Sequence, residues 1–308
     1  MIYDITLRIY YEYAQATDMG RQVVRVLPRA RAQRQRLLRS NLAIRPEPIE
    51  RRRSEDFFGN ELVELGFDCF SADFELVLRA RVERDGSSGG LDLSPDLARM
   101  REDLAMENRL DAASPLHFLG NSARVRSGAV FQDFANSHAQ ATDTVLESVI
   151  AIGQAIHDTM EFVPGATEVN TKPEDAFEAR RGVCQDFSHI MIASLRSIGV
   201  PAGYVSGFLR TLPPPGQARL EGADAMHAWV RAWCGREIGW VDYDPTNAMR
   251  AGRDHVEVAM GRDYADVSPV RGVLRSSGAS LAGHSVDMVD VAQMQAAPKR
   301  VTESAQQH

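Results

Sequence analysis

The stretch that decides the fold is RRGVCQDFSHIMIASLRSIGVPAGYVSGF, residues 180–208. Its apolar residues recur at spacings of three and four, which predicts a buried helix that starts at Cys184 and is ended by Gly199 and Pro201. Backbone N–H groups and the helix dipole at a helix start favour a thiolate. A buried, inert cysteine is also common at such a position. The chemistry therefore depends on what the rest of the chain offers Cys184.

The segments around this helix indicate an α+β domain. A helical pattern precedes it, with one apolar face between residues 142 and 160. Three alternating segments follow it and predict strands, namely AGYVSGFL (202–209), AMHAWVRAW (225–233) and EIGWVDYD (237–244). Helices first and strands afterwards predict helices packed on an antiparallel sheet.

The N-terminal third has a different pattern. IYDITLRIY, residues 2–10, alternates apolar and polar residues, and further strand candidates follow it. RDGSSGG, residues 84–90, has the composition of a flexible linker. We therefore expect an all-β domain over residues 1–88, a sandwich packed on the core where it could form one wall of a cleft. Residues 89–295 would form the catalytic core, and residues 296–308 a polar tail.

Composition excludes several classes of protein. The net charge of −7 argues against general nucleic-acid affinity, and no apolar run is long enough to span a membrane. The N-terminus lacks the basic-then-apolar layout of a signal peptide. Cys69, Cys184 and Cys234 are an odd and widely spaced set, which fits free thiols in a reducing compartment. We therefore expect a cytoplasmic protein; its oligomeric state is not indicated.

A thiolate at Cys184 needs a base, and His227 is the best candidate. His189 lies on the same helix but is turned roughly 140° away from Cys184 at 3.6 residues per turn. His227 instead lies inside a strand whose alternation puts it on one face with Trp229, Arg231 and Trp233. A polar imidazole on an aromatic-flanked face indicates a functional position.

The stretch GWVDYDPTN, residues 239–247, supplies two candidate carboxylates to orient that base. Asp242 and Asp244 face the same side of a strand, so alternation does not choose between them. Asp244 precedes Pro245 at a strand end, where it can meet a histidine of an adjacent strand. Cysteine at a helix start, then histidine, then acid is the nucleophile, base and orienter order of papain-like enzymes.

GVCQDFSHIMIASLRSIGVPAGYVSGF, DAMHAWV and GWVDYDPTN together resemble the transglutaminase-like superfamily, in particular its bacterial members with an extra N-terminal β domain. FVPGATEVNTKPEDAF and GRDYADVSPVRG are also similar to that family. The resemblance implies a papain-like α+β core with Cys184 as nucleophile, His227 as general base and acid, and Asp244 as the third member of a triad. It implies no cofactor.

Other side chains are weaker candidates. Trp229 is the tryptophan expected to touch substrate, and Asp242 is a second candidate substrate contact. Asp186 could be a further site acid, but a capping role at its helix start is favoured. Zinc is not expected, because the chain has no CxxC pair and no HExxH. A serine hydrolase is not expected either, because GYVSGF is not GxSxG.

These residues predict thiol-dependent acyl chemistry on a peptide or protein amide, through an acyl-enzyme. Hydrolysis is slightly favoured over transfer to an amine. The alternatives are a protein-glutamine amine transferase and a non-catalytic peptide-binding scaffold using the same cleft. The balance depends on residues expected near the triad: Trp229 and Trp240, which could line a dry tunnel, and Arg231, Asp242, Arg262 and Asp263, which would keep the mouth wet.

Overall fold

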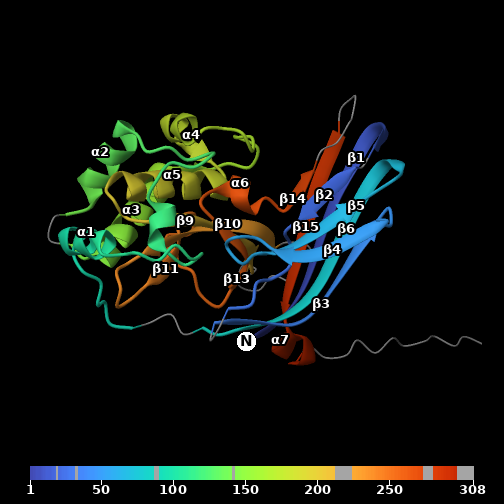
Figure 1. Ribbon diagram of the computed structural model, residues 1–308, viewed down its shortest axis with the longest axis horizontal. Coiled ribbons are helices and arrows are strands. Elements are labelled where there is room, and N and C mark those ends of the chain that lie inside the picture. Colours follow the sequence, from blue (N-terminus) through green and yellow to red (C-terminus); the bar gives the residue numbers. More distant parts are fainter. Residues whose placement is uncertain are drawn as a thin grey trace, which may run out of the picture.

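The alternating N-terminal segment forms β1 (Ile2–Asp18), which lies between β15 (Ser280–Asp290) and β6 (Phe70–Arg84) in the computed structural model of the protein (Figure 1). Ile5 and Leu7, two of its inward side chains, are at most 1% exposed. The period-two pattern therefore buries one face of the strand, as predicted. The structure describes residues 1–18, 20–31, 34–86, 90–140, 143–211, 224–272 and 280–296.

Two four-stranded antiparallel sheets form the β unit. The first has the order β15-β1-β6-β3, with β3 at Gln35–Arg45. The second has the order β14 (Val270–Gly272), β2 (Arg21–Val24), β5 (Glu61–Gly66) and β4 (Glu50–Glu55). Leu7 and Phe74 of the first sheet share one buried cluster with Val63 of the second. The two sheets thus enclose a common core, and the predicted sandwich is confirmed.

The strands of the β unit are not contiguous in sequence. β14 pairs with β2, and β15 pairs with β1 over eleven residue pairs from Tyr3↔Asp290 to Tyr13↔Ser280. Figure 1 shows these late strands, in red, beside the blue N-terminal strands. The predicted division into residues 1–88 and 89–295 therefore does not follow the sheets. The chain leaves the β unit, builds the helical unit and returns to complete both sheets.

The helical unit packs its helices on a five-stranded antiparallel sheet. The sheet has the order β12 (Met249–Arg250), β11 (Trp240–Asp244), β10 (Ala225–Trp233), β9 (Ala202–Leu209) and β13 (His255–Gly261). The other elements of this unit are α1 (Leu97–Ala105), a 3₁₀ turn (Pro115–Phe118), α2 (Ala129–His138), α3 (Val145–Thr159), β7 (Glu161–Phe162), α4 (Pro173–Ala179), β8 (Arg181–Gly182), α5 (Cys184–Ser197) and α6 (Tyr264–Val267). The last helix, α7 (Val291–Ala296), follows β15 and contacts β1 and β15 of the β unit.

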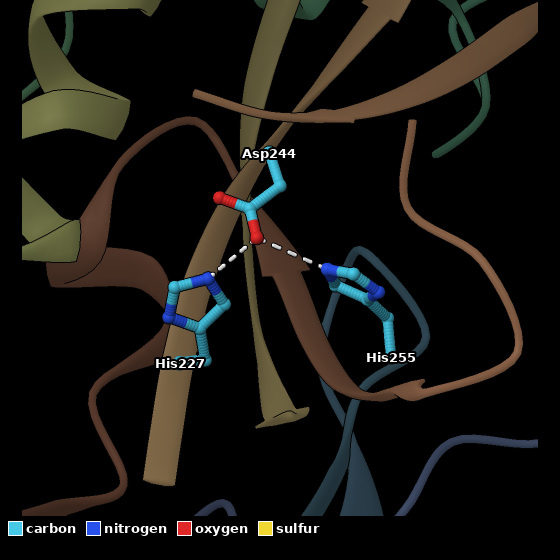
Figure 2. Close-up of side chains that lie close together, drawn as sticks. All are labelled: His227, Asp244 and His255. Atoms are coloured by element: carbon cyan, nitrogen blue, oxygen red, sulfur yellow. Dashed lines mark hydrogen bonds and ion pairs between the residues drawn. The ribbon is translucent and has the colours of Figure 1, made fainter. Parts of the chain in front are cut away.

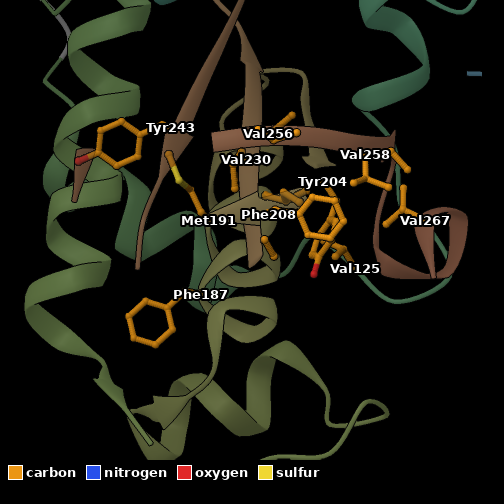
Figure 3. Packing of buried hydrophobic residues seen from close by; sticks show 14 of the residues in the cluster. Val125, Phe187, Met191, Tyr204, Phe208, Val230, Tyr243, Val256, Val258 and Val267 are labelled. Carbon is orange, nitrogen blue, oxygen red and sulfur yellow. The ribbon is translucent and has the colours of Figure 1, made fainter. Parts of the chain in front are cut away.

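α5 is the central helix of this unit. α2, α3 and α4 pack around it, and it contacts β9 and β10 of the sheet. Figure 3 shows Phe187 and Met191 of α5 in the packed core with Phe208 and Val230 of the sheet. Every residue from Gln185 to Arg196 is buried, so the helix is enclosed on all sides and not only on the predicted apolar face.

Buried polar contacts join the two units. Arg31 of the β unit places Nη1 2.8 Å from Glu257 and 3.2 Å from Asp242. Gln35 donates its amide to the carbonyl of Glu257 at 2.7 Å and accepts from its N–H at 2.9 Å. Asn60 makes the same two-way contact with the backbone of Met260. These hydrogen bonds and ion pairs cross from one unit to the other, so the units are held in one orientation.

Two predicted segments fall at the limits of the described chain. Residues 87–89 of the expected linker lie outside the described residues, as do residues 297–308 of the expected tail. Within the described residues, no helix is both long enough and apolar enough to cross a membrane.

Candidate active site

Cys184 is the first residue of α5 and is partly exposed. The carboxylate of Asp186 turns back to accept a hydrogen bond from the Val183 N–H at 2.8 Å and another from the Thr167 hydroxyl at 2.6 Å. Gly182 leaves room for it, because a Cβ there would lie 2.6 Å from an Asp186 oxygen. The helix start that presents the thiol is therefore fixed by its own third residue.

A cavity of about 330 Å³ opens beside Cys184, between the helical unit and the β unit. Its walls come from the α5 start, from β9 and β10, from α6, and from β1 and β15 of the sandwich. Among the residues that the structure describes, no aspartate, glutamate, lysine or arginine lines it. The lining residues are Ile9, Tyr11, Val169, Val183, Cys184, Gln185, Tyr204, Ser206, Met226, His227, Ala228, Tyr264, Pro269, Val270, Ala282, Gly283 and His284.

His227 faces the same cavity from β10 and is 7% exposed. Its Nε2 lies 2.7 Å from Oδ2 of Asp244, so Nδ1 is the nitrogen left for the thiol. Burial opposes a charge on this imidazole, but hydrogen bonds to Asp244 and Cys184 outweigh it and raise the pKa of His227 to about 10. The hydrogen bonds therefore favour the protonated form of His227.

Asp244, at the end of β11, is fully buried. Burial alone would raise its pKa, but hydrogen bonds from His227 and His255 hold the pKa well below its usual range. Five N–H donors surround the carboxylate: the backbone of Thr246 and Asn247 at Oδ1, and the side chains of His227, His255 and Asn247 at Oδ2. The acid is therefore ionised and held on both sides.

Sequence reasoning missed His255 and Asn247. His255 heads β13 and places Nε2 3.1 Å from Asp244 Oδ2, so two imidazoles flank one carboxylate (Figure 2). Asn247 donates its amide to the same oxygen at 2.7 Å. For Asn247 a signal existed, since it closes the DPTN stretch just after the acid. For His255 the alternation of its strand gave no such signal.

Two family models match the chain. One, the transglutaminase-like superfamily, matches residues 132–245, and the other, the bacterial transglutaminase-like N-terminal region, matches residues 3–83. An uncharacterized protein of Mycobacterium tuberculosis is 31% identical over 299 residues, covering 93% of this chain and 92% of that protein. The chain belongs to the transglutaminase-like superfamily. An uncharacterized protein of Mycobacterium leprae is also 31% identical, over 233 residues that cover 73% of this chain and 76% of that protein.

Among solved structures, the superfamily fold is shared with a candidate cysteine protease from Cytophaga hutchinsonii. That structure aligns with a TM-score of 0.72 and 23% identity, covering 94% of this chain and 91% of that one. The alignment supports the transglutaminase-like core and the N-terminal β region together.

Asp242, a predicted substrate contact, lies away from the cavity of this transglutaminase-like protein. Its carboxylate receives Arg231 Nε at 2.7 Å and Arg31 Nη1 at 3.2 Å, and it is 5% exposed. Arg231 and Arg31 hold its pKa well below the usual range in spite of burial. Asp242 therefore belongs to the buried ion-pair cluster that joins the two units. The expectation that Arg231 and Asp242 keep the cleft mouth wet is wrong.

The remaining candidates also lie outside the cavity wall. Trp229 is 1% exposed and packs edge-on against His255, with ring centroids 5.2 Å apart. Trp240 donates its indole N–H to the carbonyl of Ala113, on another side of the sheet. Arg262 pairs with Asp266, and Asp263 is the buried N-cap of α6. Asp186 caps α5, as described above. None of these side chains is among the described residues that line the cavity at Cys184.

Proposed function

We propose that the protein is a thiol-dependent amidohydrolase that cleaves an uncharged amide or peptide bond through a thioester on Cys184. One observation carries the proposal. A cysteine at a helix start and a histidine held by a buried, ionised aspartate face the same cavity. Nucleophile, base and orienter are therefore assembled where a substrate carbonyl can enter.

The reaction would proceed by acyl transfer to the thiol. His227 Nδ1 takes the proton of the Cys184 thiol, and the thiolate adds to the carbonyl carbon. The N–H of Asp186 already donates to the carbonyl of Val183, so the N–H groups of Cys184 and Gln185, the first two residues of α5, would hold the oxyanion. The Gln185 amide donates one hydrogen to the carbonyl of Val169, which leaves the second for the same oxygen. His227 then protonates the amine as the C–N bond breaks.

Deacylation would use the same residues in reverse. His227 Nδ1 takes a proton from a water molecule, whose oxygen attacks the thioester carbonyl. The C–S bond breaks, the acid leaves, and the thiolate and imidazolium pair re-forms. Asp244 stabilises the imidazolium in both halves of the cycle and keeps Nδ1 toward the sulfur.

The cavity lining supports an uncharged substrate group next to the scissile bond. The described residues that line the cavity carry no carboxylate, ammonium or guanidinium, and they include the rings of Tyr11, Tyr204 and Tyr264. A charged group would lose hydration there and, among the described residues, would meet only the Cys184, His227 and His284 side chains as partners that can carry a charge near neutral pH, whereas an apolar or amide-bearing side chain needs no charged partner.

Hydrolysis is proposed over amine transfer because water is the more abundant acceptor. An amine at millimolar concentration must compete with water at about 55 M, so transfer needs a site that excludes water. Neither Trp229 nor Trp240 lines the cavity to build such a tunnel.

A competition experiment tests the proposal. An uncharged peptide amide is supplied with and without a labelled primary amine, and the free acid and the conjugate are measured. We expect free acid to dominate at millimolar amine, with no product from Cys184→Ala and normal product from the control Cys69→Ser. Conjugate as the main product would make the protein an amine transferase, and product from Cys184→Ala would remove the thiol mechanism altogether.

A further inference from the structure

His255 is hydrogen-bonded to Asp244 of the candidate site, although it does not line the cavity or contact Cys184. It is 1% exposed and lies behind Asp244, across the carboxylate from His227 (Figure 2). Its Nε2 is 3.1 Å from Oδ2, the oxygen that lies 2.7 Å from His227. A buried histidine bonded to the orienting acid from the side opposite the base calls for a role of its own.

The tautomer of His255 follows from its second nitrogen. The Gly252 N–H lies 3.3 Å from Nδ1, and a backbone N–H can only donate. Nδ1 is therefore an acceptor, and the proton of the ring is on Nε2, pointing at Asp244. The Trp229 and His255 rings pack nearly perpendicular to each other, with centroids 5.2 Å apart, and this contact restrains the plane of the imidazole. The imidazole of His255 is therefore held in place as a hydrogen-bond donor to Asp244 through Nε2.

We propose that His255 is a positioning residue, which acts through Asp244 to keep His227 in the orientation and tautomer that Cys184 needs. This inference rests on the proposed function of the triad. With a fixed donor on each side, Oδ2 can neither rotate away from His227 nor easily take its proton. His227 then keeps Nε2–H toward the acid and Nδ1 toward the sulfur.

The same three side chains have the composition of a metal site, since their ligand atoms lie within 4.8 Å of one another. The hydrogen bonds argue for the other role. Nε2 of His255 carries the proton that faces Asp244, so its lone pair is not free for a cation. Oδ2 also accepts the Asn247 amide at 2.7 Å, which a bound cation would repel.

Two variants separate positioning from packing. His255→Phe keeps the ring and removes the donor, whereas His255→Gln keeps an N–H that can reach Asp244. We expect kcat to fall about 10- to 100-fold in the Phe variant with little change in KM, and to recover to within about fivefold of wild type in the Gln variant. A purely structural role predicts similar losses of melting temperature in both variants and an unchanged kcat for the folded protein.

A substrate-free readout keeps this test independent of the proposed function. The rate of Cys184 alkylation by iodoacetamide is followed from pH 5 to 10, because it reports the thiolate paired with His227. We expect the Phe variant to react more slowly at neutral pH and the Gln variant to resemble wild type. A Phe variant with wild-type kcat and alkylation profile would overturn the proposal, as would activity that is lost to a chelator and restored by zinc.

Discussion

Replacement of Asp244 by asparagine tests the triad at the residue with the most constrained surroundings. The carboxylate accepts two backbone N–H groups at Oδ1 and three side-chain donors at Oδ2. An asparagine has one oxygen, so its NH₂ group must face donors in either orientation. If the NH₂ group takes the place of Oδ2, Nε2 of His227 must accept a hydrogen bond from it. The ring proton of His227 then moves to Nδ1, and Nδ1 can no longer accept the proton of the Cys184 thiol.

The other orientation keeps the tautomer but is also costly. The NH₂ group then opposes the N–H groups of Thr246 and Asn247, and the imidazolium loses its counter-charge. Each buried donor left without an acceptor costs about 1–3 kcal/mol. Loss of the correct tautomer or of the charge lowers kcat by about 10²- to 10⁴-fold in a comparable triad. We expect a folded but less stable variant, with the loss in kcat and not in KM.

Asp242→Asn is the matched control, because it changes the neighbouring acid on the same strand. Asp242 pairs with Arg231 and Arg31 away from the cavity, so its loss should lower the melting temperature and leave kcat of the folded protein within a few-fold of wild type. Steady-state kinetics and thermal denaturation of both variants give the comparison. An Asp244→Asn variant with kcat within tenfold of wild type, or an Asp242→Asn variant with the larger catalytic loss, would refute the assignment.

Three further results are expected. The folded-state pKa of His227, about 10, lies above its unfolded value, so the stabilisation of the fold by protonated His227 is fully present below about pH 6.5 and is lost as pH rises through 10. In denaturant titrations, the difference in unfolding free energy between wild type and His227→Phe should shrink from pH 6.5 to 10. A difference that grows over this range would contradict the prediction. Arg31→Met should cost about 1–3 kcal/mol of unfolding free energy, because the buried carboxylates of Asp242 and Glu257 lose a partly exposed cation; an unchanged melting temperature would show that the cluster does not join the units. Ala282→Asp, an exposed change in the β15 wall of the cavity, should raise KM for an uncharged amide at constant melting temperature; an unchanged KM would mean that the sandwich does not contact substrate.

The helix start, the strands and the sandwich could be predicted because each is specified by local sequence. The spacing of apolar residues identified α5, and alternation put His227 and Asp244 inside neighbouring strands. The family resemblance then chose Asp244 over Asp242, a choice that alternation alone left open. The hydrogen bond between Asp244 and His227 agrees with that choice.

What could not be predicted depends on contacts that are remote in sequence. Asp242 faces the side that alternation indicates, but its partner Arg31 comes from 211 positions earlier, in the β unit. His255 returns to Asp244 from eleven positions further on, and its own strand pairs with β9 and not with β11. β15 resembles any half-buried strand, so nothing local shows that it joins the first sheet beside β1. These long-range pairings also create the cavity wall.

The central claim is that a thioester forms on Cys184, and mass spectrometry of the protein mixed with an uncharged peptide amide tests it most directly. The account predicts an acyl mass on the peptide that contains Cys184, and no such mass on the same peptide of Cys184→Ala. Turnover of the amide by wild type with no adduct on Cys184, together with undiminished turnover by Cys184→Ala, would contradict it.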